Sequence, residues 1–296
     1  MLTEQPNPRT ANIDQLPTLE MLRVINEEDA KVAQAVKQAL PTIAQAVDTI
    51  AEHLRQGGHV FYVGAGSSGR VGVEDAVEWT PTFGVPTDTV QSIFAGGEEA
   101  LAHSAEGAED DRDAGYAEIH AHGVTARDVV VGIAASGRTP FVLGALDAAN
   151  AIGAVTIAVT CNRSAPILER VQIGIVALVG PEVIAGSTRL KAGTAQKMIL
   201  NMLSTGSMIR LGKVYGNLMV DVAVTNQKLA QRARRVVMQI ADVDEEEAQR
   251  LLEAANLRAK PAIVMARCGV SAQQANAMLE REDGMLRRVL GTCAVA

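Results

Sequence analysis

The residue types best suited to chemistry lie in a glycine-rich segment, residues 64–70, which follows the apolar run Val60-Phe61-Tyr62-Val63. This segment contains Ser67 and Ser68 and is expected to open a helix. Backbone N–H groups at such a strand-to-helix turn bind phosphate, helped by the positive end of the helix. The spacing Gly-x-Gly-x-x-Gly also fits the fingerprint of dinucleotide sites. The segment therefore predicts a phosphate site, although a tight turn that binds nothing can have a similar sequence.

A dinucleotide makes a further demand that this chain does not meet. It needs an acidic residue at the end of the second strand, about twenty residues after the glycines, to hold the ribose. That strand is expected to end at Ile93-Phe94-Ala95-Gly96, and Asp88 precedes it. The two serine hydroxyls also suit a terminal phosphate. The sequence therefore favours a phosphate monoester over a nicotinamide cofactor.

A second loop, residues 134–140, repeats this arrangement after another apolar run. It places Ser136, Gly137, Arg138 and Thr139 where a helix is expected to begin. Ser and Thr are ordinary N-cap residues and Pro favours the first helical turn, so one such loop says little about function. Two hydroxyl-rich loops on neighbouring strands favour the binding of a phosphorylated sugar.

Strands and helices alternate along the part of the chain that contains these loops. The strands are continuous apolar runs, which indicates a parallel sheet covered by helices on both faces. We expect strands at residues 60–63, 89–94, 128–134, 154–160 and 171–179, and helices at residues 19–25, 32–54, 98–106, 139–150 and 191–211. Loops that follow parallel strands meet at one edge of the sheet. The loops at 64–70, 95–97, 136–139 and 161–164 should therefore converge.

Beyond about residue 236 the pattern is helical only. An acidic run at 242–247 is typical of a helix start. Further helices are expected at residues 245–256, 260–267, 271–280 and 285–290. We therefore divide the chain into an N-terminal helical segment (1–56), a phosphate-binding α/β domain (57–235) and a small helical domain (236–296).

The composition argues against several classes of protein. The chain has 296 residues and a net charge of −7, which argues against a nucleic-acid partner. No apolar run reaches the roughly 18 residues that span a bilayer, and residues 1–12 lack the apolar core of a signal peptide. Three widely spaced cysteines, Cys161, Cys268 and Cys293, favour reduced thiols. We expect a cytoplasmic protein with no nucleic-acid or membrane partner.

The two loops resemble those of the sugar isomerase (SIS) domain, a phosphosugar-binding, three-layer αβα sandwich with a flavodoxin-like parallel sheet. The resemblance is more specific in residues 64–78, 95–99, 106–110, 132–140, 180–197 and 216–221, which are similar to the N-acetylmuramic acid 6-phosphate etherase family. It covers nearly the whole chain. The sugar-binding domains of glucokinase regulatory protein resemble the same family.

This resemblance implies a carbon–oxygen lyase that cleaves the D-lactyl ether at C3 of the sugar and releases N-acetylglucosamine 6-phosphate and D-lactate. One carboxylate removes the C2 proton of the open-chain sugar, a second carboxyl protonates the leaving oxygen, and water then adds at C3. This chemistry needs no metal and no organic cofactor. His120 and His122 lie in a predicted polar loop without partners at metal-ligand spacing. The family also implies a homodimer, for which the apolar helix at 191–211 offers a contact surface.

The resemblance assigns the two carboxyls to Glu78, as the acid, and Glu109. Without it, both would be interpreted as solvated surface acids. The apolar Trp79 follows Glu78 and is expected to shape the surroundings of that carboxyl. For the phosphate and the sugar, the resemblance implies contacts from Ser67, Ser68, Gly69, Ser136, Gly137 and Arg138, together with Ser187, Thr188 and Lys191.

Two alternative functions share the phosphate loops. An aldose–ketose isomerase would need the C2 base but no acid at an ether oxygen. A non-catalytic phosphosugar-binding regulator could dispense with Glu78. The presence of both Glu78 and Glu109 favours the lyase. The chain departs from the family at Trp79 and Thr80, where Cys and Pro are usual, and this puts fine substrate selectivity in question.

Overall fold

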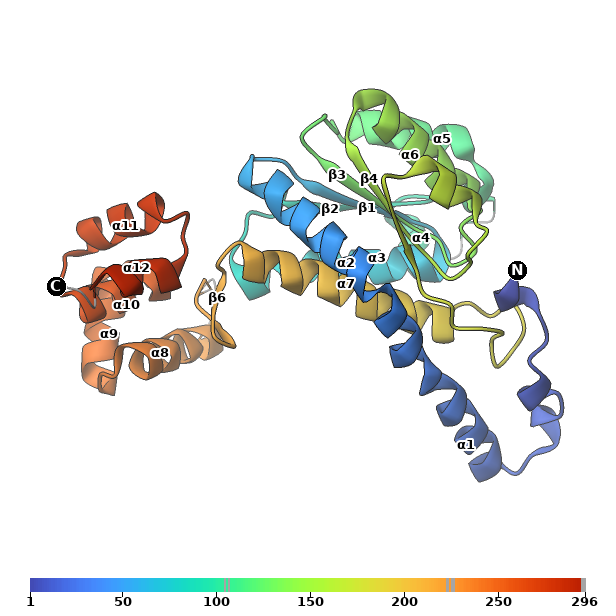
Figure 1. The fold of residues 1–296 in the computed structure, drawn as a ribbon, viewed down its shortest axis with the longest axis horizontal. Helices are drawn as coiled ribbons and strands as arrows, with labels where there is room; N and C mark the ends of the chain where they lie inside the picture. The colour runs from blue at the N-terminus through green and yellow to red at the C-terminus, as the bar shows by residue number, and fades with distance from the viewer. Residues whose placement is uncertain (104, 106, 222–223, 225–226, 294–296) are drawn as a thin grey trace. The chain divides into compact units, whose positions relative to one another are not determined.

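A five-stranded parallel sheet forms the core of the first of two compact units (Figure 1). The structure, a computed structural model, describes residues 1–296 except 104, 106, 222–223, 225–226 and 294–296. The strands are β1 (Val60–Gly64), β2 (Val90–Phe94), β3 (Val129–Ile133), β4 (Val155–Thr160) and β5 (Ile173–Val176). Their order is β2-β1-β3-β4-β5, with the reversal between β1 and β3. This flavodoxin-like order confirms the predicted fold and places a binding crevice at the carboxyl ends of β1 and β3.

Helices cover both faces of this sheet, as Figure 1 shows. One face packs against α6 (Pro140–Ile152), which in turn contacts α5 (Arg112–Ala121). The other face is covered by α2 (Lys31–Arg55), α3 (Gly66–Phe83) and α7 (Lys191–Arg210). Every residue of β1 and β3 is buried, and alternate residues such as Phe61 and Val63 join the α6-side core. Burial on both faces explains why these strands read as continuous apolar runs.

The division of the chain into units does not coincide with the predicted domain boundaries. The first unit contains residues 1–77 and 88–204, and the second contains residues 78–87 and 205–296. The boundaries lie inside α3 and α7 rather than at residues 56 and 235. The N-terminal helices α1 (Thr18–Asp29) and α2 therefore belong to the sheet unit. Short helices in this unit are α4 (Glu99–Ala102) and the 3₁₀ turns Leu2–Glu4, Pro8–Thr10, Ile13–Gln15, Ala108–Asp110 and Pro166–Arg170.

The apolar side chains of α7 belong to the core of the chain itself. Ile199, Leu200 and Leu203 are fully buried within the single chain. These three side chains are therefore already packed within the chain, and a dimer contact of α7 would have to use its exposed residues, such as Ile209.

The second unit is mainly helical, as predicted, but it contains one further helix before residue 245 that was not predicted. They are α8 (Gln227–Ala241), α9 (Glu245–Ala254), α10 (Ala259–Cys268), α11 (Ala272–Arg281) and α12 (Leu286–Cys293), preceded by the strand pair β6 (Val214–Tyr215) and β7 (Leu218–Met219). Asp244 caps α9 by accepting the Glu247 N–H at 2.9 Å. The apolar face of α8, including Val236 and Val237, packs into the core formed with α9 and α10.

The prediction of three reduced thiols is wrong for two of the cysteines. Cys268 and Cys293 form a disulfide between the last residues of α10 and α12. The two helices contact one another, which brings together sulfur atoms that lie 25 residues apart in the sequence. Cys161 is free and buried, and burial raises the pKa of its thiol to about 12.

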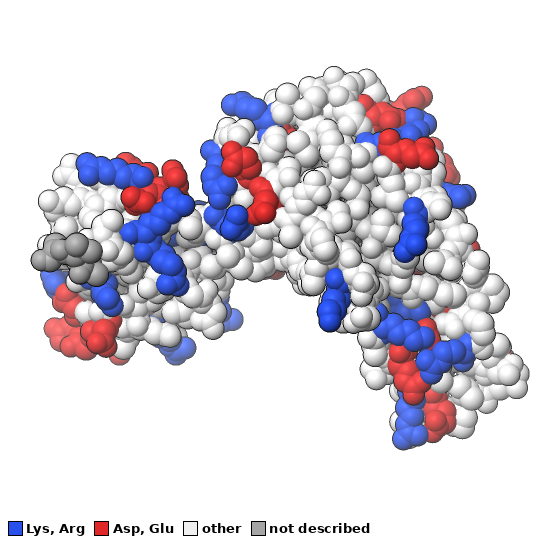
Figure 2. Space-filling model, viewed as in Figure 1, with Lys and Arg blue, Asp and Glu red and all other residues white. Residues whose placement is uncertain are grey.

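Several predicted elements have other bounds in the structure. The helix predicted at 98–106 is the single turn α4, and residues 104 and 106 lie outside the described residues. His120 lies in α5 and His122 caps it, so the prediction of a polar loop is wrong there. No helix among the described residues is both long enough and apolar enough to cross a membrane. On the face shown in Figure 2, the described Lys and Arg side chains are interspersed with Asp and Glu and form no broad basic patch.

Candidate active site

Two adjoining pockets open at the carboxyl ends of the sheet strands, and residues of the first unit alone line them. The serine pocket is lined by Glu4, Ser67, Ser68, Asp110, Ser136, Arg138, Thr139, Pro140 and Thr188, with Ala135. The alanine pocket is lined by Arg70, Phe94, Ala95, Ala100, Ala105, Gly107 and Ala108. Ala65, Gly66 and Glu109 line both pockets. The loops after β1 and β3 therefore converge, as their positions after parallel strands predicted.

The glycines of the first loop shape the turn so that its serines face the serine pocket. Gly66 has a positive φ of 53° and is the first residue of α3. A Cβ on Gly69 would lie 2.6 Å from ring carbons of Phe94 and 2.7 Å from the carbonyl carbon of Gly64. Gly69 is buried and lines neither pocket, so it acts by letting α3 approach β1, whereas a direct ligand contact was predicted.

The second loop is fixed in a similar way. Gly137 has a φ of 65°, and a Cβ there would lie 2.4 Å from the Cβ of Ala165. It is buried and, like Gly69, lines neither pocket. Ser136 Oγ accepts the Arg138 N–H at 3.2 Å, which leaves the hydroxyl proton of Ser136 available to a ligand. Asn162 Nδ2 donates to the Ala135 carbonyl at 2.9 Å and ties this loop to the end of β4.

Arg70, in the first half of α3, contacts the short helix α4 that follows β2. Its Nε donates to the Leu101 carbonyl at 3.0 Å and its Nη2 to the Ala100 carbonyl at 2.9 Å. Its guanidinium also lies 5.5 Å from the centre of the Phe94 ring. These contacts hold one wall of the alanine pocket against the first phosphate loop.

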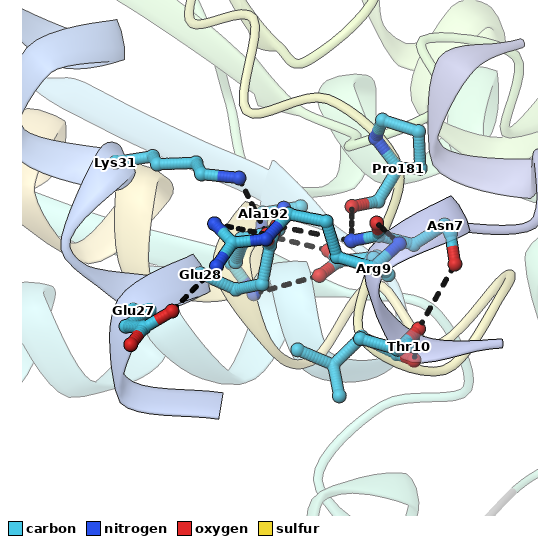
Figure 3. A network of polar contacts seen from close by, with 11 residues as sticks. Asn7, Arg9, Thr10, Glu27, Glu28, Lys31, Pro181 and Ala192 are labelled. Atoms are coloured by element: carbon cyan, nitrogen blue, oxygen red, sulfur yellow. Dashed lines mark hydrogen bonds and ion pairs between the residues drawn. The ribbon is translucent and has the colours of Figure 1, made fainter. Parts of the chain in front are cut away.

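Lys191 is not a surface lysine and belongs to a buried polar network. Its side chain is 1% exposed, and its Nζ lies 2.7 Å from Glu28 Oε2. Asn7 Nδ2 donates to the same oxygen at 3.0 Å, and Lys31 and Arg9 pair with the other oxygen (Figure 3). Burial by itself raises the pKa of Glu28, but hydrogen bonds from Lys191, Lys31 and Asn7 outweigh it and lower the pKa to about 2. The Lys191 ammonium therefore forms a buried ion pair with Glu28.

The backbone at the start of α7 is held by a second buried acid. Glu182 accepts the N–H groups of Lys191 at 3.0 Å and Ala192 at 2.9 Å. Burial raises the pKa of Glu182, and the two backbone hydrogen bonds oppose that effect. A carboxyl at a helix N-terminus complements the helix dipole. Of the three residues predicted around this segment, Thr188 lines the serine pocket, whereas Ser187 does not line it and Lys191 supports the fold.

The two predicted catalytic carboxyls lie in different units. Glu109 belongs to the 3₁₀ turn Ala108–Asp110, where it is exposed and lines both pockets of the first unit. Glu78 lies near the end of α3 in the second unit and is exposed. The next residue, Trp79, is only 1% exposed. Consecutive residues of a helix point in different directions, so the Trp79 ring lies inside the protein while Glu78 faces solvent. The expectation that the indole shapes the surroundings of Glu78 gains no support from this arrangement.

Within the first unit, the arrangement suits a phosphorylated sugar. Hydroxyls of Ser67, Ser68 and Ser136 and the guanidinium of Arg138 can neutralise and orient a phosphate at one end. Glu109 supplies a carboxylate within the same pocket for proton transfer. Among the described residues, no group of three or more His, Cys, Asp or Glu side chains is placed to hold a metal ion.

The chain is similar to known proteins of the SIS and etherase families. The glucokinase regulatory protein N-terminal SIS domain matches residues 42–150. The N-acetylmuramic acid 6-phosphate etherase of Photorhabdus laumondii is 50% identical over 287 residues, which are 97% of this chain and 95% of that protein. The etherase of Aeromonas hydrophila is 52% identical over 286 residues, covering 97% and 96% of the two chains. These likenesses extend through both units of the chain.

The fold is also shared with solved structures of more distant proteins. A phosphoheptose isomerase from Francisella tularensis has a TM-score of 0.53 at 19% identity and covers 66% of this chain and 100% of its own. A phosphoheptose isomerase from Neisseria gonorrhoeae has a TM-score of 0.51 at 18% identity, with coverage of 64% and 98%. At these identities the likeness concerns the fold alone.

Proposed function

The chain belongs to the N-acetylmuramic acid 6-phosphate etherase family, and we propose that it cleaves the D-lactyl ether of this sugar phosphate. The products are N-acetylglucosamine 6-phosphate and D-lactate. The observation that supports this function most strongly is identity of about half the residues to etherases along nearly the full length of both chains. The position of Glu109 in a pocket with phosphate-loop hydroxyls agrees with it.

In this proposal, the serine pocket holds the 6-phosphate and Glu109 acts on the sugar. Glu109 takes the C2 proton of the open-chain sugar, whose acidity comes from the C1 aldehyde. The electron pair forms a C2–C3 double bond, the C3–O bond breaks, and Glu78 protonates the departing lactyl oxygen. In the second half, water adds at C3 and loses its proton to Glu78, and Glu109 returns a proton to C2. Atoms and charges balance without a cofactor.

Release of D-lactate from N-acetylmuramic acid 6-phosphate tests this function. The wild type should release lactate, and in D₂O the product should contain deuterium at C2. The Glu109→Gln variant should lose both signals, because an amide cannot take the C2 proton. Asp113→Asn is a matched control, because Asp113 is an exposed acid in the first turn of α5 that lines neither pocket.

The same assay separates the alternatives. Tight binding of the sugar phosphate without lactate or deuterium exchange would indicate a regulator. Exchange at C2 with formation of a ketose and no lactate would indicate an isomerase. Loss of lactate but not of C2 exchange in Glu78→Gln would support Glu78 as the acid. A cytoplasmic location stays a prediction from the composition, and a homodimer stays a prediction from the family resemblance, which sedimentation equilibrium tests.

A further inference from the structure

Glu4 places a carboxylate in the serine pocket, at a position that no sequence motif predicts. It ends the 3₁₀ turn Leu2–Glu4 and lines the pocket together with Ser67, Ser136 and Thr188. Within the described residues, its side chain accepts no hydrogen bond and forms no ion pair. A carboxylate can only accept hydrogen bonds, so this one lacks partners in the protein.

The backbone next to Glu4 is firmly attached to both sides of the site. Thr3 is fully buried, and its carbonyl accepts the Gly186 N–H at 2.9 Å. The Leu2 N–H donates to Asn162 Oδ1 at 3.2 Å, and the same Asn162 side chain holds the loop that contains Ser136. The N-terminal turn is therefore linked to the second phosphate loop.

The side chain of Glu4 lies over a residue that leaves room for it. A Cβ on Gly186 would lie 2.9 Å from Glu4 Oε2, and Gly186 has a positive φ of 77° that favours glycine. Two residues further on, Thr188 lines the same pocket. The segment that supplies Thr188 thus also accommodates the Glu4 carboxylate.

Glu4 is exposed, so water solvates its carboxylate until a ligand enters the pocket, and a ligand that displaces this water must itself supply a hydrogen-bond donor. Glu4 repels a phosphate dianion, so it does not serve the phosphate itself. It instead suits a hydrogen-bond donor that enters with the phosphate, and hydroxyls of the sugar chain are such donors. In an open-chain sugar 6-phosphate whose C2 and C3 face Glu109, the free hydroxyls between the phosphate and the reacting carbons are at C4 and C5, and the one at C4 is next to the reacting C3.

We propose that Glu4 is a specificity-determining residue that accepts a hydrogen bond from the C4 hydroxyl of the bound sugar 6-phosphate. The inference rests on the proposed function for the identity of the sugar. Glu4 thereby distinguishes a sugar phosphate from inorganic phosphate, which offers no such hydroxyl and meets only the repulsion. It also fixes how far the sugar enters the pocket, and so where C2 lies relative to Glu109.

The Glu4→Gln and Glu4→Ala variants test this with two ligands that should respond differently. Loss of a charge-assisted hydrogen bond should lower kcat/KM for N-acetylmuramic acid 6-phosphate by about 10- to 100-fold. Inhibition by inorganic phosphate should become tighter or stay unchanged, because a repulsive charge has gone. Weaker binding of both ligands would indicate a structural role and overturn the proposal, and so would unchanged kcat/KM.

Calorimetric binding of N-acetylglucosamine 6-phosphate and its 4-deoxy analogue identifies the hydroxyl. Wild type should prefer the hydroxylated sugar by about 10-fold or more, and Glu4→Ala should show little preference. An equal preference in both proteins would overturn the assignment to C4. Asp14→Asn, an exposed acid change in the same N-terminal segment, should behave as wild type.

This binding assay also separates the two proposals. If wild type releases no lactate but Glu4→Ala loses the preference for the C4 hydroxyl, the proposed reaction fails and the role of Glu4 stands. If wild type releases lactate and the preference survives in Glu4→Ala, the role of Glu4 fails and the reaction stands.

Discussion

Substitution of Glu28 by Gln should destabilise the sheet unit strongly and in a pH-dependent way. Glu28 is 1% exposed and pairs with the equally buried Lys191. Its pKa falls from 4.5 to about 2 on folding, because hydrogen bonds from Lys191, Lys31 and Asn7 outweigh the effect of burial. At about 1.4 kcal/mol per pH unit, that difference corresponds to about 3 kcal/mol of stability. Breaking a buried ion pair from one side costs about 3–5 kcal/mol, which is of the same order.

The direction of the pH dependence follows from the lowered pKa. The carboxylate stabilises the folded state fully above pH 4.5, and this contribution is lost as the pH falls towards 2. Urea unfolding of wild type and Glu28→Gln, followed by circular dichroism from pH 7 down to pH 3, measures the difference. It should be about 3 kcal/mol at pH 7 and should shrink steadily below pH 4.5.

The neighbouring acid provides a matched control for this experiment. Glu27 pairs with Arg9 on the surface, where its side chain is 58% exposed. Glu27→Gln should therefore cost less than about 1 kcal/mol. The reasoning would be refuted if the two variants lost similar stability at pH 7, or if the loss in Glu28→Gln were the same at every pH.

Two further predictions concern the glycine loop and the cysteines. Gly69→Ala should lower stability by about 1–3 kcal/mol and weaken inhibition by inorganic phosphate, because its Cβ would meet Phe94 at 2.6 Å. A Cβ on Gly66 would have no atom within 4 Å, so Gly66→Ala should lower stability by only about 1 kcal/mol, because of the positive φ at this position. Equal losses of stability for the two variants in urea unfolding would contradict this difference. Titration of the denatured, unreduced protein with a thiol reagent should find one thiol, that of Cys161, because the other two cysteines form a disulfide. Three reactive thiols would contradict the pairing.

The sheet could be predicted from the sequence because its strands carry their own signal. Each strand buried on both faces is a continuous apolar run, and the helices between them exclude antiparallel hairpins. No helix was predicted at the position of α8, because its first residues are mostly polar and the apolar stripe becomes dense only near Val236. The disulfide was missed because its two sulfurs meet only when α10 and α12 pack, which spacing along the chain does not reveal.

The site divides into parts that were predictable and parts that were not. The phosphate loops were predictable because glycines and hydroxyls act there through the backbone conformation of a few consecutive residues. Lys191 was expected to bind the sugar, but its partner Glu28 lies 163 residues away in sequence. Glu4 is placed at the serine pocket by the hydrogen bonds of its neighbours Leu2 and Thr3 to Asn162 and Gly186, which no local pattern could indicate.

The same long-range contacts connect stability to the geometry of the site. Asn7 donates to both Glu28 and the Pro181 carbonyl, and Thr10 Oγ1 donates to the Val183 carbonyl at 2.8 Å. The first ten residues are thereby attached to the segment that leads to Thr188 and to the start of α7. Each phosphate loop is shaped largely by nearby glycines, whereas the side of the pocket formed by Glu4 and Thr188 depends on this buried polar network. Changes in the network should therefore alter recognition of the sugar before they alter binding of the phosphate.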